Sequence, residues 1–429
     1  MESFEYDSKN TRKILKKIEH QESLVAVPGS KSISHRVVIC ASIADGESHI
    51  NNLLKSEDIH YTVLALSRMG ARIEEKQKGS FAVKGFHGRP HPFLDPIYLG
   101  NSGTSMRLLA GIAALGDSRY IFTGDKRMQQ RPMGNLLNAL KMIDVSAESE
   151  YGNNAPPVKI KGNRTKGGKL SLDCSKSSQY LSSLLMMGAV LENGLDITLP
   201  SPAVSAPYID LTMDIMEKFN VYAERKNDLE YHVPGSQRYS AGEFTIEPDI
   251  SNASYFWAAG AITGKMVKVA NITQASLQGD LRFLNILEQM GCKIEFDAEG
   301  AGVKGNSLKA VEVDMSDIPD VVPTLCVIAA FATGRSVIRN IGHLREKECD
   351  RMDAVVSQLN KMGINADQGE TWISVDGGTP AGALIETFND HRIAMAFSVA
   401  GLRVLGMEIE NPGCVAKSFP SFWDIFEKF

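Results

Sequence analysis

The sequence predicts an α+β fold of two domains, each built from three copies of one repeated unit. An amphipathic helix pattern that leads into a strand-like segment recurs roughly every 72 residues, which is typical of an internally repeated architecture. A second and almost wholly apolar helix pattern recurs between these copies. The chain has 429 residues, a length that suits two or three domains of ordinary size.

The amphipathic helix pattern sets the period of the repeat. Five copies read LALSRMGARIEE, LLNALKMIDVSAES, TMDIMEKFNVYAER, LNILEQMGCKIEF and SQLNKMGINADQ. The predicted turn residues are Gly70, Ile143, Asn220, Gly291 and Gly363. Glycine or asparagine after a helix suits a left-handed C-cap and isoleucine does not, so the second copy fits the pattern least well. A sixth copy, PSFWDIFEKF, reaches the chain end before its turn.

The apolar helix pattern predicts six buried helices with polar first turns. These helices open with SHR, GTSMR, SSQ, SNAS, PD and DHR, and the rest of each is nearly apolar all round. N-capping accounts for a residue such as Ser178 or Ser251, but it does not require Arg36, Arg107 and Arg392. Because helix N-termini attract anions, we expect the six first turns to converge on one anion-binding site.

The incomplete sixth copy predicts how the repeats divide between domains. The first thirty residues, which include SLVAV, could supply the strands that the sixth copy lacks. We therefore expect one domain at 31–246 and a discontinuous one at 1–30 plus 247–429. Chain crossings near Pro28 and Pro248 would join them, with the active site in the interdomain cleft.

The composition excludes several classes of protein. Apolar content of 43% and charged content of 23% are typical of soluble globular chains, and a net charge of −5 argues against nucleic-acid binding by bulk electrostatics. The longest apolar stretch, LCVIAAFA, is too short to span a membrane, and the N-terminus has no signal-peptide pattern. The six scattered cysteines, without a CxxC pair, predict reduced thiols in a cytoplasmic protein. No HExxH or paired Cys/His spacing occurs, so we expect no metal site.

Nine segments, taken in order, resemble one enzyme family. They are PGSKSISHR, LGNSGTSMRLL, RMQQRP, SSQYLSSLLM, SAPYIDLTMDIM, EPDISNASYFWAAG, LREKECDR, NDHRIAMAFSVAGL and AKSFPSF. From about residue 24 to the C-terminus the chain is similar to the 5-enolpyruvylshikimate-3-phosphate synthases. The resemblance implies transfer of the enolpyruvyl group of phosphoenolpyruvate to the 5-hydroxyl of shikimate 3-phosphate, by a monomer without metal or organic cofactor. It also implies two domains of three βαβαββ units with buried parallel helices.

The resemblance further implies which residues hold the two anionic substrates. Arginines and lysines are natural partners for phosphates and carboxylates. The expected contacts of shikimate 3-phosphate are Lys31, Ser32, Arg36, Ser177, Ser178, Ser205, Tyr208, Asp320, His343 and Lys347. The expected contacts of phosphoenolpyruvate are Lys31, Asn101, Gly103, Thr104, Arg131, Gln179, Glu348, Arg351, His391, Arg392 and Lys417. Among these, Arg351 and Arg392 are expected to hold its carboxylate. Lys31 therefore serves both substrates.

The reaction needs a base for the 5-hydroxyl and an acid for the methylene carbon of phosphoenolpyruvate. By resemblance, the catalytic residues are Asp320, Glu348, Lys347 and Lys31. We hypothesise that Glu348 is the acid and Asp320 the base, because a closing, low-dielectric cleft can tune carboxylates toward neutral pKa values. His391 can be interpreted equally well as a contact of phosphoenolpyruvate or as a structural residue that caps its helix.

The chain departs from the common family pattern at three places, and three other functions compete. Ser102 stands where many relatives have alanine. His343 stands where relatives often have asparagine, and Leu108 follows Arg107 where many have proline, although Gly103 favours binding of glyphosate-like anions. The sister transferase that acts on UDP-N-acetylglucosamine has a loop cysteine, which the segment 124–132, GDKRMQQRP, lacks. The others are a catalytically inactive relative and an unrelated phosphate-binding enzyme such as a kinase, for which no P-loop is present.

Overall fold

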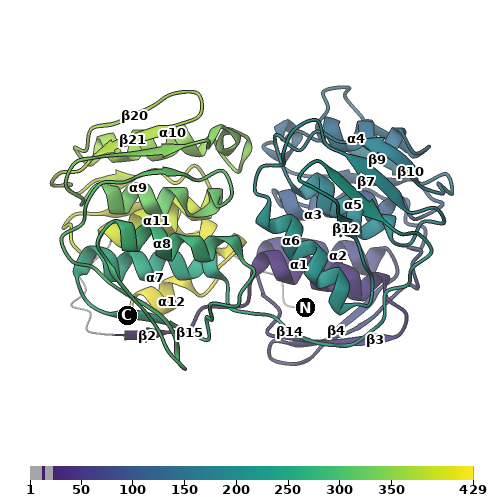
Figure 1. The fold of residues 1–429 in the computed structure, drawn as a ribbon, viewed down its shortest axis with the longest axis horizontal. Helices are drawn as coiled ribbons and strands as arrows, with labels where there is room; N and C mark the ends of the chain where they lie inside the picture. The colour runs from purple at the N-terminus through teal and green to yellow at the C-terminus, as the bar shows by residue number, and fades with distance from the viewer. Residues whose placement is uncertain (1–11, 15–22, 429) are drawn as a thin grey trace. The chain divides into compact units, whose positions relative to one another are not determined.

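The computed structural model describes residues 12–14 and 23–428 as two compact units. One unit spans Gly29–Ile246, and the other joins the described residues up to Pro28 with those from Glu247 onward. In Figure 1 the first runs from purple to teal along the chain, and the second combines the purple strand β2 with a stretch that runs from teal-green to yellow. Both combine helices with small mixed sheets, which confirms the predicted α+β class.

The unit of residues 29–246 contains six α-helices and three four-stranded sheets. The helices are α1 Lys31–Ile43, α2 Glu57–Arg68, α3 Gly103–Ala113, α4 Gly134–Lys141, α5 Gln179–Gly188 and α6 Pro207–Lys218, with a 3-10 turn η1 at Met128–Gln130. The first sheet has the order β14 Glu243–Thr245, β3 Glu47–Asn51, β5 Ser80–Lys84 and β4 Arg72–Gln77. The second has β6 Ile97–Tyr98, β7 Tyr120–Thr123, β9 Val158–Lys161 and β8 Ser146–Ser149. The third has β10 Gly168–Ser171, β11 Leu195–Thr198, β13 Glu230–Val233 and β12 Glu224–Arg225. In each sheet the first pair is parallel and the other pairs are antiparallel.

The second unit repeats this plan. Its helices are α7 Ile250–Thr263, α8 Phe283–Gln289, α9 Val322–Ala329, α10 Arg351–Lys361, α11 His391–Ala400 and α12 Phe422–Phe426. Its 3-10 turns are η2 Gly279–Arg282, η3 Pro319–Val321, η4 Gly342–Glu346 and η5 Pro412–Lys417. Two sheets have the orders β2 Ser23–Val25, β15 Val267–Ala270, β17 Gly300–Lys304, β16 Lys293–Phe296, and β18 Glu312–Asp314, β19 Arg335–Arg339, β21 Ile373–Asp376, β20 Ala366–Gln368. A three-stranded sheet has β1 Arg12–Ile14, β23 Glu408–Glu410 and β22 Leu384–Ile385.

The segment SLVAV was predicted to supply a strand to the sixth copy of the repeat, and this prediction was wrong. The strand Ser23–Val25 pairs in parallel with β15, which belongs to the fourth copy of the repeat. The strand that joins the sixth copy is β1, which pairs antiparallel with β23. A strand of three residues carries no pattern that selects one sheet edge over another, because each edge offers the same backbone groups.

The C-caps of the amphipathic helices follow one geometry in all five copies. The left-handed residues are Gly70, Asp144, Asn220, Gly291 and Gly363, with φ between 58° and 108°. After each of them, the next N–H donates to the carbonyl five residues earlier, as in Val145 to Leu140 at 3.2 Å. This bond is typical of the Schellman motif. The predicted turn residue Ile143 was therefore wrong by one position, and Asp144 takes the left-handed conformation that aspartate tolerates.

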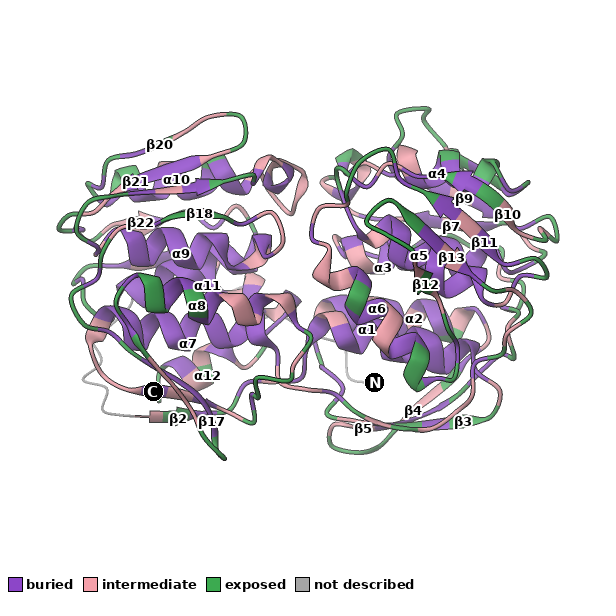
Figure 2. Cartoon of the chain, viewed as in Figure 1, coloured by how far each residue is buried: buried purple, intermediate pink, exposed green. Residues whose placement is uncertain are grey.

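The apolar helices form the two cores. Every residue of α9 is buried, as is every residue of α7 from Ile250 to Ile262. Figure 2 shows α3, α5, α7, α9 and α11 almost wholly in the colour of buried residues, while exposed positions concentrate on strands and loops. Each unit has its own buried hydrophobic cluster. In the described chain, no helix is both long and apolar enough to cross a membrane.

Candidate active site

The unit of residues 29–246 buries a cation at the start of α1. Arg36 is 1% exposed and donates to Thr212 Oγ1 at 2.7 Å, Ser32 O at 3.0 Å, Ser182 Oγ at 3.1 Å and Tyr208 O at 3.2 Å. All of these acceptors are neutral, and no carboxylate of the described residues pairs with Arg36. Burial lowers the pKa of Arg36 to about 10, so the guanidinium stays charged at neutral pH. A buried cation with neutral partners favours an added anion.

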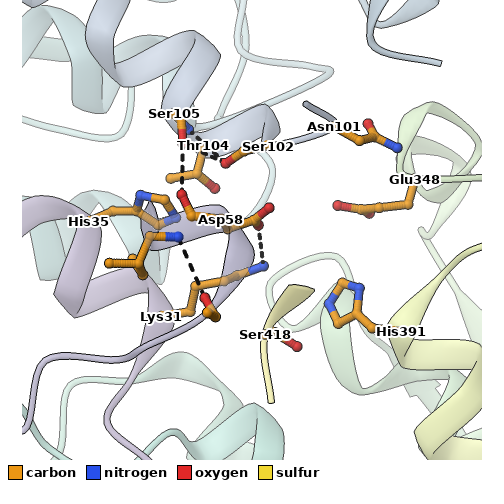
Figure 3. Close-up of polar contacts among 12 residues, drawn as sticks. Lys31, His35, Asp58, Asn101, Ser102, Thr104, Ser105, Glu348, His391 and Ser418 are labelled. Carbon is orange, nitrogen blue, oxygen red and sulfur yellow. Dashed lines mark hydrogen bonds and ion pairs between the residues drawn. The ribbon is translucent and has the colours of Figure 1, made fainter. Parts of the chain in front are cut away.

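Lys31 lies in the first turn of α1 and pairs with a residue that the sequence analysis missed. Its Nζ lies 3.2 Å from Asp58 Oδ2 in α2, and both side chains are nearly buried. In Figure 3 the Lys31 amine points at the Asp58 carboxylate, and Ser102 and Ser105 lie beside it at the start of α3. Ser105 Oγ is 3.3 Å from the Asp58 carbonyl oxygen. The first turns of α1, α2 and α3 are thus tied together around Lys31.

Arg131 lies against the first residue of α3. Its Nη1 donates to both the carbonyl and the side-chain oxygen of Asn101, each at 3.0 Å. A Cβ on Gly103 would lie 2.5 Å from Arg131 Nη2 and 2.7 Å from its Cζ. Such contacts are too short for any side chain, so glycine is required for Arg131 to occupy this position.

Gln179, the first residue of α5, is held in one orientation from both sides. Its Oε1 accepts from Arg107 Nη1 at 2.8 Å, and its Nε2 donates to Thr104 Oγ1 at 2.9 Å. Arg107 is 4% exposed and lies over the Tyr180 ring at 5.5 Å. The structure thus brings the predicted residues Thr104 and Gln179 together, and adds Arg107 as the residue that orients them.

The predicted serine residues at the starts of α5 and α6 are buried. Ser177 Oγ accepts from the Gln179 N–H at 3.2 Å, and Ser178 is the N-cap residue of α5. Ser178 makes no side-chain capping bond within the described residues, so capping does not account for it. Ser205 takes a left-handed φ of 56° just before α6, which begins one residue before Tyr208.

In the second unit, Arg351 is the centre of a carboxylate network. It is 1% exposed and donates to Asp390 Oδ2 at 2.7 Å, to Glu348 Oε2 at 2.7 Å and to Asp320 Oδ1 at 3.0 Å. Burial lowers the pKa of Arg351, but the three carboxylates outweigh it and raise the pKa well above its ordinary value. The network brings the predicted residues Asp320, Glu348 and Arg351 together.

Arg392 belongs to the same network through Asp320. Its Nη2 lies 2.5 Å from Asp320 Oδ2, and its Nη1 lies 3.4 Å from the Tyr255 hydroxyl. Asp390 caps α11 by accepting from the Arg392 N–H at 2.9 Å while it also holds Arg351. The sequence analysis missed Asp390, although its position before an apolar helix in NDHR was a signal for a cap. The cap of α11 is Asp390, and His391 is the buried first residue of the helix.

The remaining predicted residues of this unit lie in two 3-10 turns and their ends. His343, in η4, is 8% exposed, and burial, with a smaller effect of Lys347, lowers its pKa to about 3. The imidazole of His343 is therefore neutral at physiological pH. Lys347 follows η4 directly, and Lys417 is the buried last residue of η5.

The described residues contain no cluster of side chains suited to bind a metal ion. In residues 12–14 and 23–428, no group of three or more His, Cys, Asp or Glu side chains could hold a metal ion. All six cysteines, each within the described residues, carry free thiols.

Known proteins of similar sequence and fold indicate the family of this chain. The family model of EPSP synthase (3-phosphoshikimate 1-carboxyvinyltransferase) matches residues 15–426. The 3-phosphoshikimate 1-carboxyvinyltransferase of Syntrophobacter fumaroxidans is 41% identical over 420 residues, which cover 97% of this chain and 99% of that protein. The chloroplastic enzyme of the same name from Brassica napus is 38% identical over 437 residues, covering 96% of this chain and 84% of that protein. A solved EPSP synthase from Acinetobacter baumannii has a TM-score of 0.81 and 30% identity, with 97% of each chain covered. The chain therefore belongs to the EPSP synthase family.

Proposed function

We propose that this chain transfers the enolpyruvyl group of phosphoenolpyruvate to the 5-hydroxyl of shikimate 3-phosphate and releases phosphate, as a step of the shikimate pathway. The observation that carries this proposal is the buried Arg36, a cation whose described partners are all neutral oxygen atoms. A phosphorylated substrate supplies the negative charge that such a site favours.

Shikimate 3-phosphate is assigned to the first turns of α1, α5 and α6. The proposed contacts are Lys31, Ser32, Arg36, Ser177, Ser178, Ser205 and Tyr208, together with Asp320, His343 and Lys347 from the second unit. The hydroxyls of Ser177 and Ser178 are buried beside the first turn of α5, where they can donate to phosphate oxygens. His343 remains neutral, so it can donate from one ring nitrogen and accept at the other.

Phosphoenolpyruvate is assigned to the cations around α3 and to those of the second unit. The proposed contacts are Lys31, Asn101, Gly103, Thr104, Arg131, Gln179, Glu348, Arg351, His391, Arg392 and Lys417. Gly103 supports this assignment because it lets the Arg131 guanidinium lie directly against the start of α3. The carboxylate of phosphoenolpyruvate would replace internal carboxylates on Arg351 and Arg392, since both arginines are already paired.

The chemistry requires proton transfer in both directions. The 5-hydroxyl oxygen bonds to the carbon that carries the phosphate, so the hydroxyl proton must leave and the methylene carbon must gain a proton. When phosphate departs, the methyl carbon formed in the first step loses a proton and the carbon–carbon double bond is restored. We assign the hydroxyl proton to Asp320 and the carbon proton to Glu348, with Lys347 and Lys31 stabilising the charge on the phosphate groups. Arg351 supports this pairing because it holds both carboxylates.

We further propose that the enzyme acts as a cytoplasmic monomer without a metal ion or organic cofactor. The free thiols support a reducing compartment. Sedimentation equilibrium at micromolar concentration tests the monomer, and a stable dimer there would contradict it.

The test of the proposed function is phosphate release from purified protein. Phosphoenolpyruvate and shikimate 3-phosphate are mixed with the enzyme in the presence of a chelator, with shikimate as the acceptor control. Glu348→Gln is expected to lower turnover by about 100-fold or more, because general acid–base catalysis contributes about that much. The matched variant Glu370→Gln, at an exposed position of the same unit, should keep normal turnover. Calorimetric binding of both substrates without turnover would instead indicate a catalytically inactive relative.

A further inference from the structure

A buried carboxyl outside the predicted site lies within electrostatic range of the proposed base Asp320. Asp280 belongs to η2 and is 4% exposed. Its Oδ2 accepts from the Ser251 hydroxyl in the first turn of α7. Its Oδ1 is buried and has no hydrogen-bond partner among the described residues. A carboxylate in this environment would be only half satisfied, which favours the protonated form.

The charged groups that face Asp280 come from three neighbouring elements. They are Asp320 in η3, Arg392 in α11 and Asp249, the cap of α7. Both η2 and η3 pack on α7, so the structure holds Asp280 and Asp320 against the same helix. The carboxylate of Asp320 in turn lies 2.5 Å from Arg392 Nη2, through Oδ2, and 3.0 Å from Arg351 Nη1, through Oδ1. The two carboxyl groups therefore share one electrostatic environment.

The surroundings of Asp280 raise its pKa above the ordinary aspartate value. Burial, followed by the negative charge of Asp320, raises its pKa to about 7, while the hydrogen bond from Ser251 and the charge of Arg392 act in the opposite direction. Interaction between two carboxyl groups is mutual, so ionisation of Asp280 must also raise the proton affinity of Asp320.

We propose that Asp280 is a positioning residue that tunes Asp320 as the proton acceptor of the reaction. While Asp280 keeps its proton, the two arginines stabilise the negative charge of Asp320 and make it a weak base. When Asp280 gives its proton to solvent, repulsion between the two carboxylates makes Asp320 a stronger base. Asp280 itself does not touch the substrate in this proposal, which rests on the proposed function and on the role of Asp320 within it.

The test compares kcat and KM across pH 5.5 to 9 in wild type and Asp280→Asn. In wild type, kcat is expected to rise as Asp280 ionises. In Asp280→Asn this rise should be missing, with kcat at pH 8.5 about threefold lower than wild type and nearly equal at pH 5.5, since basicity and rate are coupled. KM for both substrates should stay within about twofold of wild type, because the residue acts through Asp320 rather than on the ligands.

Two further variants keep the test decisive. Ser251→Ala removes the hydrogen bond that favours ionised Asp280, so the rise in kcat should move to higher pH. Asp317→Asn removes a half-exposed carboxylate three residues from Asp320 and should leave the profile in place, because solvent screens that charge. A profile that neither Asp280→Asn nor Ser251→Ala moves overturns the inference. An equal loss of kcat at every pH in Asp280→Asn also overturns it, since that is the mark of a structural role.

Failure of the proposed function is separable from failure of this inference. Carbon-13 NMR of protein labelled at aspartate carboxyl carbons reports the titration of Asp280 without any turnover, and Asp280→Asn assigns the resonance. Absence of phosphate release from wild type would refute the proposed function, even with Asp280 titrating near neutral pH. Normal release with a carboxyl that titrates near pH 4 would refute only the inference.

Discussion

Replacement of Gly103 by alanine offers a direct test of the phosphoenolpyruvate half of the site. The added Cβ would lie 2.5 Å from Arg131 Nη2, whereas comfortable contacts begin near 3.5 Å, so the guanidinium must retreat by about 1 Å. That movement disturbs the two 3.0 Å bonds from Arg131 to Asn101. A misplacement of this size costs about 10-fold to 100-fold in binding of the reacting group, or about 1.4 to 2.7 kcal/mol.

The same substitution should not lower stability. Alanine is favoured over glycine in helices by up to about 1 kcal/mol, and Gly103 is the first residue of α3. We therefore expect KM for phosphoenolpyruvate to rise at least about 10-fold, with KM for shikimate 3-phosphate and the Tm nearly unchanged. Gly378→Ala is the control, because a Cβ at Gly378 would meet only Ile364 Cδ1 at 3.4 Å, which is an ordinary contact distance. An unchanged KM for phosphoenolpyruvate in Gly103→Ala would refute the reasoning.

Three further predictions follow from the same geometry. Arg36→Lys should weaken calorimetric binding of shikimate 3-phosphate by about 10-fold or more, because a lysine cannot reproduce the fork of bonds to Thr212, Ser182 and Tyr208; equal affinity would contradict the assignment of Arg36. Glyphosate, an anionic mimic of phosphoenolpyruvate, should inhibit competitively with phosphoenolpyruvate, and Gly103→Ala should weaken that inhibition; absence of inhibition at millimolar concentration counts against the unobstructed pocket. The pKa of Asp280 is about 7 in the folded protein and 3.8 as the ordinary value, so the unfolded chain loses this proton at lower pH than the folded one. The free energy of unfolding of the wild type should therefore fall as pH rises from 3.8 to about 7, by at most about 4 kcal/mol. The Tm of Asp280→Asn relative to wild type should therefore be higher at pH 8 than at pH 5, and a constant difference would show that Asp280 does not titrate there.

The repeat was predictable because its signal is periodic. A helix that buries one face has a different hydrophobic pattern from a helix that is buried on all sides, so the two helices of each repeat can be told apart. The turns that end the amphipathic helices recur at similar spacing, and this reveals the period even though the copies share few identical residues. The one misplaced turn, Ile143 in place of Asp144, arose because helix ends are poorly fixed by hydrophobic pattern alone. The misassigned strand Ser23–Val25 arose because strand partners depend on tertiary contacts.

The candidate site was predictable where its residues are cations in a motif and less so where they are carboxylates. Asp58 follows Ser56 at the start of α2, where an acidic residue is ordinary, and its bond to Lys31 spans 27 positions in the chain. Asp390 resembles a simple helix cap until its bond to Arg351, 39 positions away, is seen. Asp280 has no motif at all, and only its burial against Ser251 distinguishes it.

The buried arginines Arg36, in one unit, and Arg351 and Arg392, in the other, are all cations but have partners of different charge, and this has a consequence for binding. Arg36 has neutral acceptors among the described residues, so a phosphate there adds a missing counter-charge without breaking an ion pair. Arg351 and Arg392 are already held by Asp320, Glu348 and Asp390, so a substrate carboxylate must displace at least one of these groups. A carboxylate displaced from a buried arginine loses the partner that favoured its charged form, and its proton affinity rises. If Arg351 receives the substrate carboxylate as proposed, binding of phosphoenolpyruvate prepares Asp320 and Glu348 for proton transfer, which gives a physical reason for placing the proposed acid and base on one arginine.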